Sequence, residues 1–297
     1  MKNAIILIFF LAIGCVAQAQ EQTGTSGNST DETKETVLAP DNITIAAFNI
    51  QVFGKSKASN EEVMEVLART ARNFDIIAVQ EIRDSSGESL PQLVERINAM
   101  GEPGYNFTVG PRLGRTSSKE QYAYIYREGI ELLGNSTFND SGDLFHREPY
   151  MARFRAGDFD FVLITLHSDP DETPEELDSL PEVFREAREE YPEDDFILLG
   201  DLNADCNYLR PDDNISLRSD EYIWLVGDEA DTTVKSTDCA YDRIIITNST
   251  SAEYSGTWGI FRFDQEYGLN QSMAEDVSDH YPVFATFISS QGQEEPR

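Results

Sequence analysis

The segment FILLGDLN spans Phe196 to Asn203 and closes an apolar run on an acid and an amide. Continuous apolar runs of this length are typical of strands that are buried on both faces. The same form recurs in three other segments, which end on an amide, a carboxylate and an imidazole: Ile43 to Asn49, Phe74 to Glu81 and Phe159 to His167. One polar residue at a strand end is more often part of a turn than of a site. Because the same ending recurs in four segments, we expect strands that carry ligand and acid–base groups to one edge of a sheet.

Around this segment, the pattern of apolar residues predicts a single α/β domain. Further buried strands are expected at residues 122–127, 244–247 and 281–288, and amphipathic helices at 60–72, 90–100 and 173–190. Thr173 is expected to cap the last helix, because Pro174 and acidic residues follow it. This mixture favours sheets that pack together and are covered by helices. We place the domain at residues 42–289 and a flexible tail at 290–297.

The N-terminus indicates export. Lys2 precedes an apolar run from Ala4 to Ile13, and small residues follow at 17–19, so residues 1–19 resemble a secretory signal peptide. The run is shorter than the roughly 20 residues that cross a bilayer, so no membrane span is expected. Leu11 to Cys15 also resembles a lipoprotein signal, which keeps a lipid anchor at Cys15 as an alternative. Residues 20–41 are polar and acidic and are expected to form a disordered linker. The expected location is extracellular, with a periplasmic or lipid-anchored protein as the alternatives.

Two cysteines remain after removal of the signal peptide, Cys206 and Cys239. An even number of cysteines in an oxidising compartment predicts a disulfide, and two unrelated buried thiols are the alternative. Closing this loop would stabilise the fold by roughly 3–4 kcal/mol in the chain-entropy model.

The formal net charge of −31 opposes a nucleic-acid substrate, because an acidic surface repels phosphate groups. Bound divalent cations reverse the local field at a carboxylate-rich site, and high ionic strength screens surface repulsion. The charge therefore also predicts a saline habitat and a salt-tolerant protein.

The strand-end residues suit a hard cation. Oxygen ligands such as Asn49, Glu81 and Asp201 favour Mg²⁺, Mn²⁺ or Ca²⁺, whereas Zn²⁺ would call for more His or Cys. His167 follows a strand and His280 lies in Ser-Asp-His-Tyr-Pro, although a single buried histidine is more often a core residue. Two histidines, orienting carboxylates and a metal together meet the needs of phosphodiester hydrolysis, which are a base, an acid and positive charge.

Two further polar segments do not indicate a function when each is considered alone. Residues 114–120 are consistent with a surface turn, and residues 239–243 with a disulfide anchor at the start of a strand.

Taken together, motifs along the chain resemble the deoxyribonuclease I family of the endonuclease/exonuclease/phosphatase superfamily. The matching segments are Phe48-Asn49-Ile50, Gln80 to Asp84, Gly114 to Glu120, Arg147-Glu148-Pro149, Leu166-His167-Ser168, Gly200 to Cys206, Asp231-Thr232-Thr233, Cys239 to Arg243 and Ser278 to Pro282. Gln-Glu-x-Arg-Asp, Arg-Glu-Pro and Cys-Ala-Tyr-Asp-Arg are the more specific elements. The resemblance runs from about residue 42 to 288 and implies a four-layered α/β sandwich, with two packed mixed β-sheets flanked by helices.

The resemblance also implies the site. His167 with Glu120 and His280 with Asp242 would form two acid–base dyads, and which histidine is the acid stays open. A catalytic Mg²⁺ or Mn²⁺ ion and the scissile phosphate would be held by Glu81, Asn49, Asp201, Asn203 and Asp279. Arg83 would enter the minor groove of a DNA substrate, and Arg147 would contact phosphate. Cys206 and Cys239 match the family's disulfide.

The sequence departs from the family in places that affect binding. Gln51 stands where the family has arginine, and Ser118 where it has a groove-stacking tyrosine, so weaker preference for groove shape is expected. A structural Ca²⁺ site is expected at Asp231 and Thr233, but Lys235 replaces a family threonine there. In the shortened loop at residues 139–143, Ca²⁺ binding by Asp140 and Asp143 is only an alternative.

These features predict a secreted, metal-dependent DNA endonuclease without a stable protein partner. The alternatives are a phosphoesterase of the same superfamily that acts on small or lipid phosphoesters, and a non-catalytic binding protein on this fold.

Overall fold

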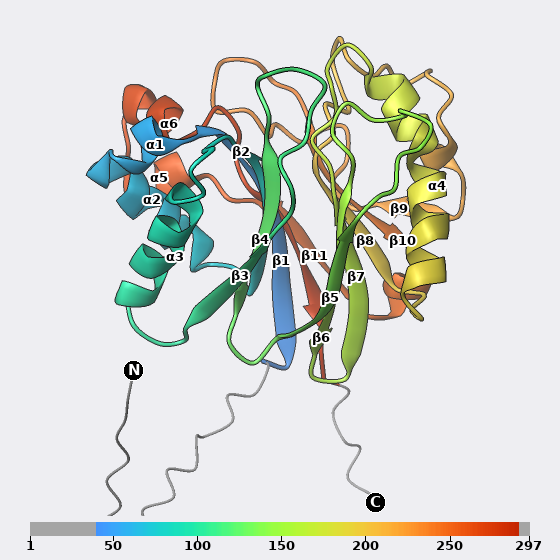
Figure 1. Ribbon diagram of the computed structural model, residues 1–297, viewed down its shortest axis with the longest axis horizontal. Coiled ribbons are helices and arrows are strands. Elements are labelled where there is room, and N and C mark those ends of the chain that lie inside the picture. The colour runs from blue at the N-terminus through green and yellow to red at the C-terminus, as the bar shows by residue number, and fades with distance from the viewer. Residues whose placement is uncertain (1–39, 291–297) are drawn as a thin grey trace, which may run out of the picture. The chain divides into compact units, whose positions relative to one another are not determined.

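Two six-stranded β-sheets lie at the centre of the molecule (Figure 1). A computed structural model describes residues 40–290, so the expected signal peptide, Cys15, nearly all of the linker and most of the tail lie outside the described residues. The first sheet has the order β11-β12-β1-β2-β4-β3 and the second β5-β6-β7-β8-β10-β9. The strands of the first sheet are β1 (Asn42–Phe53), β2 (Ile76–Ile82), β3 (Tyr105–Val109), β4 (Gln121–Arg127), β11 (Tyr254–Ile260) and β12 (Val283–Ile288). Those of the second are β5 (Glu131–Thr137), β6 (Tyr150–Ala156), β7 (Phe159–Thr165), β8 (Phe196–Asp201), β9 (Tyr222–Trp224) and β10 (Asp242–Thr247).

Both sheets are mixed, because each contains one parallel pair. β1 is parallel to β2, and β7 is parallel to β8. The remaining neighbours are antiparallel. A parallel pair needs a crossover connection, and helices supply it in both sheets. The two strands of each pair therefore end at the same edge of their sheet.

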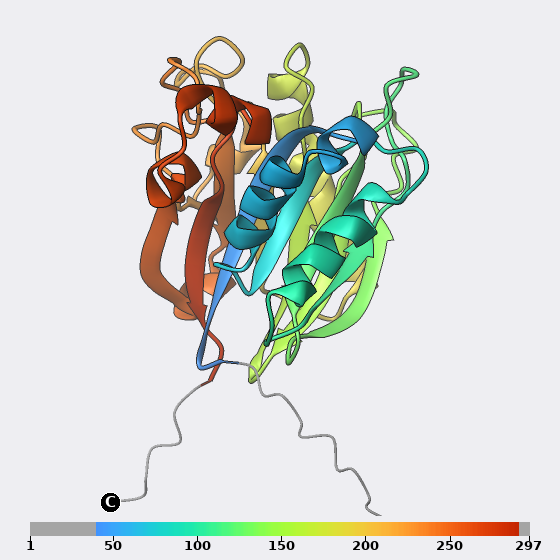
Figure 2. The same ribbon diagram turned by 90° about the vertical axis from the view of Figure 1, so that its left-hand side faces the viewer.

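Helices cover the outer face of each sheet, as Figures 1 and 2 show. Five of them lie on the first sheet: α1 (Lys55–Ala58), α2 (Glu61–Ala71), α3 (Ser89–Ala99), α5 (Phe263–Tyr267) and α6 (Gln271–Val277). The long helix α4 (Thr173–Glu190) covers the second sheet, next to the short helix η1 (Ser216–Arg218). A second short helix, η2 (Ser249–Ala252), follows β10. Within residues 40–290 we find no helix with the length and apolarity to cross a membrane.

Apolar side chains fill the space between the layers. Phe154, Phe161 and Phe287 belong to the cluster between the two sheets, and separate clusters lie beneath the helices on either side. Burial of aromatic rings of this size is a major stabilising contribution in a core. The predicted four-layered α/β sandwich is confirmed.

The strands that the sequence pattern missed are mostly edge strands. β3, β5, β9 and β11 each end a sheet, so one side of each is open and the continuous apolar run of a central strand is not needed. β6 is central, but Arg153 and Arg155 interrupt its apolar pattern and pair with Asp160 on β7.

The predicted cap of α4 is wrong. The helix spans the expected residues, but Glu172 occupies the cap position and makes no capping hydrogen bond with its side chain. Thr173 is the first helical residue, and its hydroxyl donates to the carbonyl of Asp169.

Candidate active site

Strand ends from both sheets meet at one edge of the sandwich. Asn49 lies in β1 and Glu81 in β2, while Asp201 ends β8. Asp242 begins β10 and is paired in register with Asp201. All four side chains are buried, although each carries a charge or an amide. Buried polar groups of this kind must be paired or hold a ligand.

His167 and Glu120 form a first dyad across the two sheets. His167 follows β7 of the second sheet, and Glu120 directly precedes β4 of the first. The imidazole Nδ1 lies 2.9 Å from Glu120 Oε2. The backbone N–H of His167 donates to the Tyr122 hydroxyl at 3.0 Å, which fixes the main chain below the ring.

The surroundings favour the charged form of both members of this dyad. Burial disfavours the Glu120 carboxylate, but His167, Arg147 and Arg83 outweigh it and lower the pKa of Glu120 to about 2. Burial also disfavours the imidazolium, but the hydrogen bond to Glu120 and the charge of Asp201 outweigh it and raise the pKa of His167. Each member of the dyad therefore stabilises the charged form of the other.

His280 and Asp242 form a second dyad with the opposite arrangement. His280 precedes β12 of the first sheet, and Asp242 belongs to the second sheet. Nδ1 of His280 lies 2.8 Å from Asp242 Oδ2, and Asp242 is fully buried. Burial opposes the imidazolium, but the charges of Asp242 and Asp201 outweigh it and raise the pKa of His280 to about 10.

Asp201 joins the two dyads. Its Oδ2 atom lies 3.5 Å from Nε2 of His167 and 3.5 Å from Nε2 of His280. Burial opposes its charge, but the two histidines and the Asn49 amide outweigh it and lower the pKa of Asp201. In each histidine, Nδ1 therefore contacts the carboxylate of its own dyad and Nε2 faces Asp201 Oδ2.

Glu81 is fixed at the same edge by a bulge in β1. The Asn49 side-chain amide donates to Glu81 Oε1 at 3.1 Å and to Asp201 Oδ2 at 2.9 Å. The backbone N–H of Val52 donates to Glu81 Oε2 at 2.8 Å. Gln51, Val52 and Glu81 have positive φ values of 44°, 53° and 59°. Residues other than glycine are strained in this conformation, and such strain is concentrated at functional sites.

The two predicted DNA-contacting arginines lie in different environments. The Arg83 guanidinium bridges Glu81 and Glu120 at 3.0 and 2.8 Å, and its side chain is 31% exposed. Arg147 is buried beneath the first dyad, and it donates to the carbonyls of His167 and Ser168. In this structure Arg147 therefore supports the His167 segment.

Asn203 and Asp279 flank the dyads. The Asn203 side chain donates to the carbonyl of Ser168, and its backbone N–H donates to Asp201 Oδ1. Asp279 Oδ1 lies 4.0 Å from Nε2 of His280, while Oδ2 pairs with Lys235 at 3.0 Å. The structure thus brings all of the predicted catalytic and metal-site residues to one edge.

The donor set fits a hard divalent cation. Glu81 and Asp201 are buried carboxylates that share the Asn49 amide, and Asp201 also lies in a group with Asp242 and His280 whose possible ligand atoms are within 4.8 Å of one another. Asp242 Oδ1 is buried and has no hydrogen-bond partner among the described residues. Carboxylate oxygens are the donors that Mg²⁺ and Mn²⁺ prefer.

The predicted calcium residues lie beside this edge. Thr233 donates to Asp231 Oδ1 through its backbone N–H and through its hydroxyl, the latter at 2.9 Å. Arg262 lies 3.3 Å from Asp231 Oδ2 and neutralises part of its charge. In the 139–143 loop, Asp140 accepts from two backbone N–H groups and Asp143 pairs with Arg115.

The predicted disulfide is present between Cys206 and Cys239, whose Cα atoms are 6.0 Å apart. It joins the loop that carries Asn203 to the segment that leads into Asp242. The covalent link therefore restrains the loop after Asp201 and the segment before Asp242 relative to each other.

Residues outside the predicted dyads and ligand set also shape the site. Lys57 donates to the carbonyls of Ile50 and Val277, and so ties the β1 bulge to the segment before His280. Gly200 has φ +151°, and a Cβ there would lie 2.1 Å from the Leu166 carbonyl oxygen. Gly200 lies in the matching segment Gly200 to Cys206, whereas Lys57 gave no signal in the sequence because its contacts depend on the tertiary fold.

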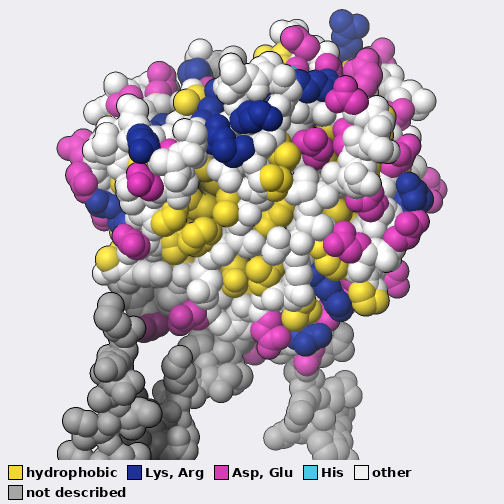
Figure 3. Space-filling view, in the orientation of Figure 1, with side chains coloured by type: hydrophobic (Ala, Val, Ile, Leu, Met, Phe, Trp, Pro, Cys, Tyr) yellow, Lys and Arg dark blue, Asp and Glu magenta, His cyan; other side chains and the backbone are white. Residues whose placement is uncertain are grey.

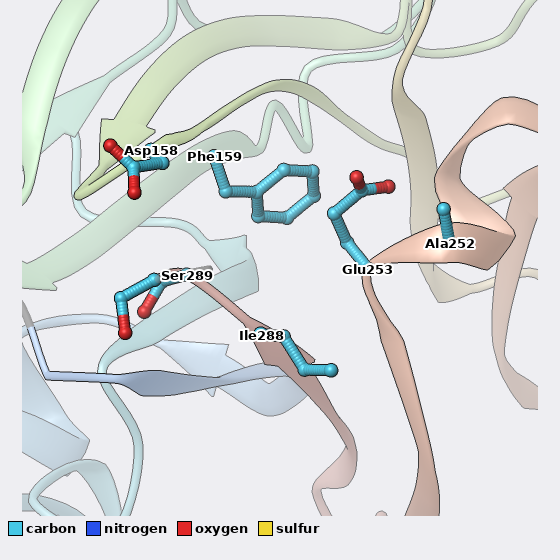
Figure 4. Close-up of a pocket in the computed structure, with 7 residues that line it drawn as sticks. Asp158, Phe159, Ala252, Glu253, Ile288 and Ser289 are labelled. Atoms are coloured by element: carbon cyan, nitrogen blue, oxygen red, sulfur yellow. The ribbon is translucent and has the colours of Figure 1, made fainter. Parts of the chain in front are cut away.

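A pocket at the opposite end of the strands contains none of these residues (Figure 4). It is lined by residues near the start of β7 and the end of β12, among them Asp158, Phe159, Glu253, Ile288 and Ser289. The dyads lie where β7 ends and β12 begins, so this pocket belongs to the other edge of the sandwich.

Comparison with known proteins agrees with this geometry. Residues 46–280 match the model of the Endonuclease/Exonuclease/phosphatase family. The chain belongs to this family. Among its curated members, deoxyribonuclease gamma of Mus musculus is 38% identical over 80% of this chain and 82% of its own length. Deoxyribonuclease-1 of Bos taurus is 36% identical over 82% of this chain and 91% of its own length. The resemblance to the deoxyribonuclease I branch is confirmed.

Solved structures of the family share the fold at low sequence identity. A humanized TDP2 from D. rerio superposes with a TM-score of 0.59 at 16% identity and covers 84% of this chain and 99% of its own. A mannosyl-6-phosphatase from Bacteroides thetaiotaomicron superposes with a TM-score of 0.55 at 16% identity, over 83% of this chain and 99% of its own. These likenesses show the architecture alone, because the same fold serves different substrates.

Proposed function

We propose that this protein is a secreted endonuclease that hydrolyses phosphodiester bonds of DNA with two His–carboxylate dyads and a carboxylate-bound divalent metal. The observation that carries the proposal is the position of Asp201 Oδ2, 3.5 Å from Nε2 of both dyad histidines. The relatives named as deoxyribonucleases support DNA as the substrate.

The dyads supply the proton transfers of hydrolysis. Each carboxylate accepts the Nδ1 proton and fixes the tautomer, which leaves Nε2 to act on the substrate. The histidine that acts as the base does so in its neutral form and accepts a proton at Nε2 from the attacking water, while the other, as the imidazolium, donates a proton to the leaving oxygen. Asp201, between them, favours the imidazolium form of whichever histidine carries the proton.

The metal is proposed to be Mg²⁺ or Mn²⁺ bound to Glu81, with Asn49, Asp201, Asn203 and Asp279 helping to hold either the ion or the scissile phosphate. Such an ion would supply positive charge that stabilises the negative charge developing on the phosphate oxygens. In the structure the Asn49 amide nitrogen faces Glu81 and Asp201, so Asn49 serves as a donor that orients both carboxylates.

Binding of DNA by so acidic a protein requires a local basic surface. Arg83 and Arg112 both donate to the turn formed by Ser118 and Lys119, beside the first dyad. Figure 3 shows Lys and Arg side chains gathered in the upper part of one face, with acidic side chains toward its rim. We propose that Arg83 contacts the groove and that the buried Arg147 keeps its bonds to the His167 segment while its charge attracts a phosphate. We also propose that high salt screens the remaining acidic surface.

Nicking of supercoiled plasmid tests the proposal. The wild type is expected to nick plasmid with Mg²⁺ and not with EDTA, and Glu81→Ala or His167→Ala to leave it intact. Matched controls are Glu88→Ala, an exposed glutamate paired with Lys55, and His146→Ala, the histidine outside the dyads. Both controls should retain activity. Nicking by Glu81→Ala at the wild-type rate would contradict the proposal.

A substrate panel separates the alternatives. Duplex DNA, single-stranded DNA, RNA and small or lipid phosphoesters are compared at equal metal concentration, in low salt and in molar salt. DNA cleavage that persists in molar salt supports the salt-tolerant nuclease. Faster hydrolysis of small or lipid phosphoesters would favour the related phosphoesterase, and no hydrolysis with any substrate would favour a binding protein.

Export and calcium binding complete the proposal. The disulfide suits an oxidising compartment, and the mass of the mature N-terminus distinguishes signal-peptide cleavage from lipidation at Cys15. A structural Ca²⁺ at Asp231 and Thr233 would have to compete with Arg262 for the Asp231 carboxylate, so we expect a weak site. Isothermal titration with Ca²⁺, compared between the wild type and Asp231→Asn, tests this.

A further inference from the structure

Arg83 links the proposed metal carboxylate to the first dyad. The guanidinium Nη2 lies 3.0 Å from Glu81 Oε2 and 2.8 Å from Glu120 Oε1. The other terminal nitrogen, Nη1, donates weakly to the exposed Ser118 hydroxyl at 3.3 Å. The backbone N–H donates to the carbonyl of Phe53, so the main chain of Arg83 is anchored while its side chain remains partly exposed.

The two carboxylate oxygens of Glu81 contact partners of different charge. Oε1 accepts from the neutral Asn49 amide at 3.1 Å. Oε2 accepts from the backbone N–H of Val52 at 2.8 Å and faces the Arg83 guanidinium. Among the residues that the structure describes, the Arg83 guanidinium is thus the cation in direct contact with Glu81. A divalent ion on the same carboxylate would lie close to that positive charge, and the two would repel.

We propose that Arg83 competes with the divalent ion for Glu81, so that ion binding releases the guanidinium from Glu81 and makes it available to the DNA backbone or groove. This inference rests on the proposed function, because it takes Glu81 as a metal ligand. The ion pair between Glu120 and Arg83, at 2.8 Å, would remain, so the Arg83 side chain stays beside the first dyad after its release from Glu81. Because coupling between ligands is reciprocal, the ion strengthens DNA binding and DNA strengthens ion binding.

Equilibrium binding of Mn²⁺ to the metal-free protein measures the competition without any need for turnover. Free Mn²⁺ is counted by electron paramagnetic resonance, at low salt, for the wild type, Arg83→Ala, Arg83→Gln and Arg83→Lys. Loss of a unit charge a few ångströms from the ion is expected to tighten Mn²⁺ binding on the order of tenfold in Arg83→Ala and Arg83→Gln. Arg83→Lys keeps the charge and should lie between them and the wild type.

Arg96→Ala is the matched control. Arg96 is 29% exposed, close to the value for Arg83, and pairs with Glu61 and Glu65 on the helical face of the first sheet. Arg96→Ala removes the same charge from the helical face rather than from beside Glu81, so the Mn²⁺ affinity of this variant should stay within about twofold of the wild type because the interaction between two charges falls with distance. Equal tightening in Arg96→Ala and Arg83→Ala would overturn the proposal in favour of a general effect of net charge.

Glu81→Gln separates this inference from the proposed function. If Glu81→Gln leaves Mn²⁺ affinity unchanged, the ion does not use Glu81, and both the metal assignment and the competition are wrong. If Glu81→Gln weakens binding but Arg83→Ala and Arg83→Gln bind no tighter than the wild type, the metal assignment stands and the competition is refuted. Thermal unfolding of each variant confirms that the measured affinities belong to folded protein.

Discussion

Replacing Glu120 by glutamine tests how strongly the first dyad is held as an ion pair. The substitution keeps the shape of a side chain that is only 3% exposed, and it removes the charge that faces His167, Arg83 and Arg147. The loss should appear as reduced stability near neutral pH and as reduced activity. His167 loses the acceptor that fixes its tautomer, so the rate should fall by roughly 10²–10⁴-fold.

The size and pH window of the stability loss follow from the lowered pKa of Glu120. A change from the ordinary 4.5 to about 2 corresponds to about 3 kcal/mol, at about 1.4 kcal/mol for each pKa step. A carboxyl whose pKa is lowered on folding stabilises the protein above its unfolded pKa, and this stability is lost as pH falls through the folded pKa. The difference between wild type and Glu120→Gln should therefore be about 3 kcal/mol at pH 6 and about 1 kcal/mol at pH 3.

Urea unfolding at pH 6 and pH 3, with EDTA present, measures this difference. The control is Glu95→Gln, an exposed glutamate on α3, which should change the free energy of unfolding by less than about 0.5 kcal/mol at either pH. Equal destabilisation by Glu120→Gln at both pH values would refute the ion-pair argument. So would a difference at pH 6 no larger than that of the control.

Three further predictions concern the frame around the dyads. Gly200→Ala should lower the free energy of unfolding by roughly 1–3 kcal/mol and reduce nicking, because its Cβ would collide with the Leu166 carbonyl next to the first dyad. Gly54→Ala is the control, because a Cβ at Gly54 would meet nothing within 4 Å, and it should preserve the free energy of unfolding and the nicking rate. Equal losses of unfolding free energy in the two variants, measured by urea melts, would show that the collision is not the cause. Ser118→Tyr should tighten binding to duplex DNA by roughly 1–3 kcal/mol and alter the cleavage pattern on an end-labelled duplex, and an unchanged pattern would contradict the loss of groove stacking. Cys239→Ser should lower the free energy of unfolding by roughly 3–4 kcal/mol in a urea melt, and a loss below about 1 kcal/mol would mean that the disulfide restrains the unfolded chain little.

The central strands and their polar ends were predictable because they are local patterns. Each apolar run, such as the one that ends at Asp201, is buried on both faces and leaves a continuous signal in the sequence. The edge strands gave no such signal; in β5, for example, the side chains alternate between exposed and half-buried. The position of a strand in its sheet therefore decided whether its apolar pattern could be recognised, except in central β6, where Arg153 and Arg155 interrupt that pattern.

The pairing of residues at the site was predictable only in part. The family resemblance indicated which carboxylate belongs to which histidine, and both pairs are present in the structure. It gave no indication that Arg147 is buried under the first dyad or that Arg83 bridges two carboxylates. These contacts depend on how the two sheets are stacked, and separations along the chain carry little information about that.

Each dyad takes one residue from each sheet, and the site therefore depends on the packing between the sheets. Glu120 and His280 precede strands of the first sheet, whereas His167 follows a strand of the second sheet and Asp242 begins one. Movement of one sheet against the other would lengthen both Nδ1–carboxylate contacts at once. A misplacement of about 1 Å can cost roughly 10²-fold in rate, while the fold itself tolerates small repacking. Substitutions in the cluster between the sheets should consequently reduce nicking before they reduce the cooperativity of unfolding, whereas equivalent substitutions beneath α4 should not.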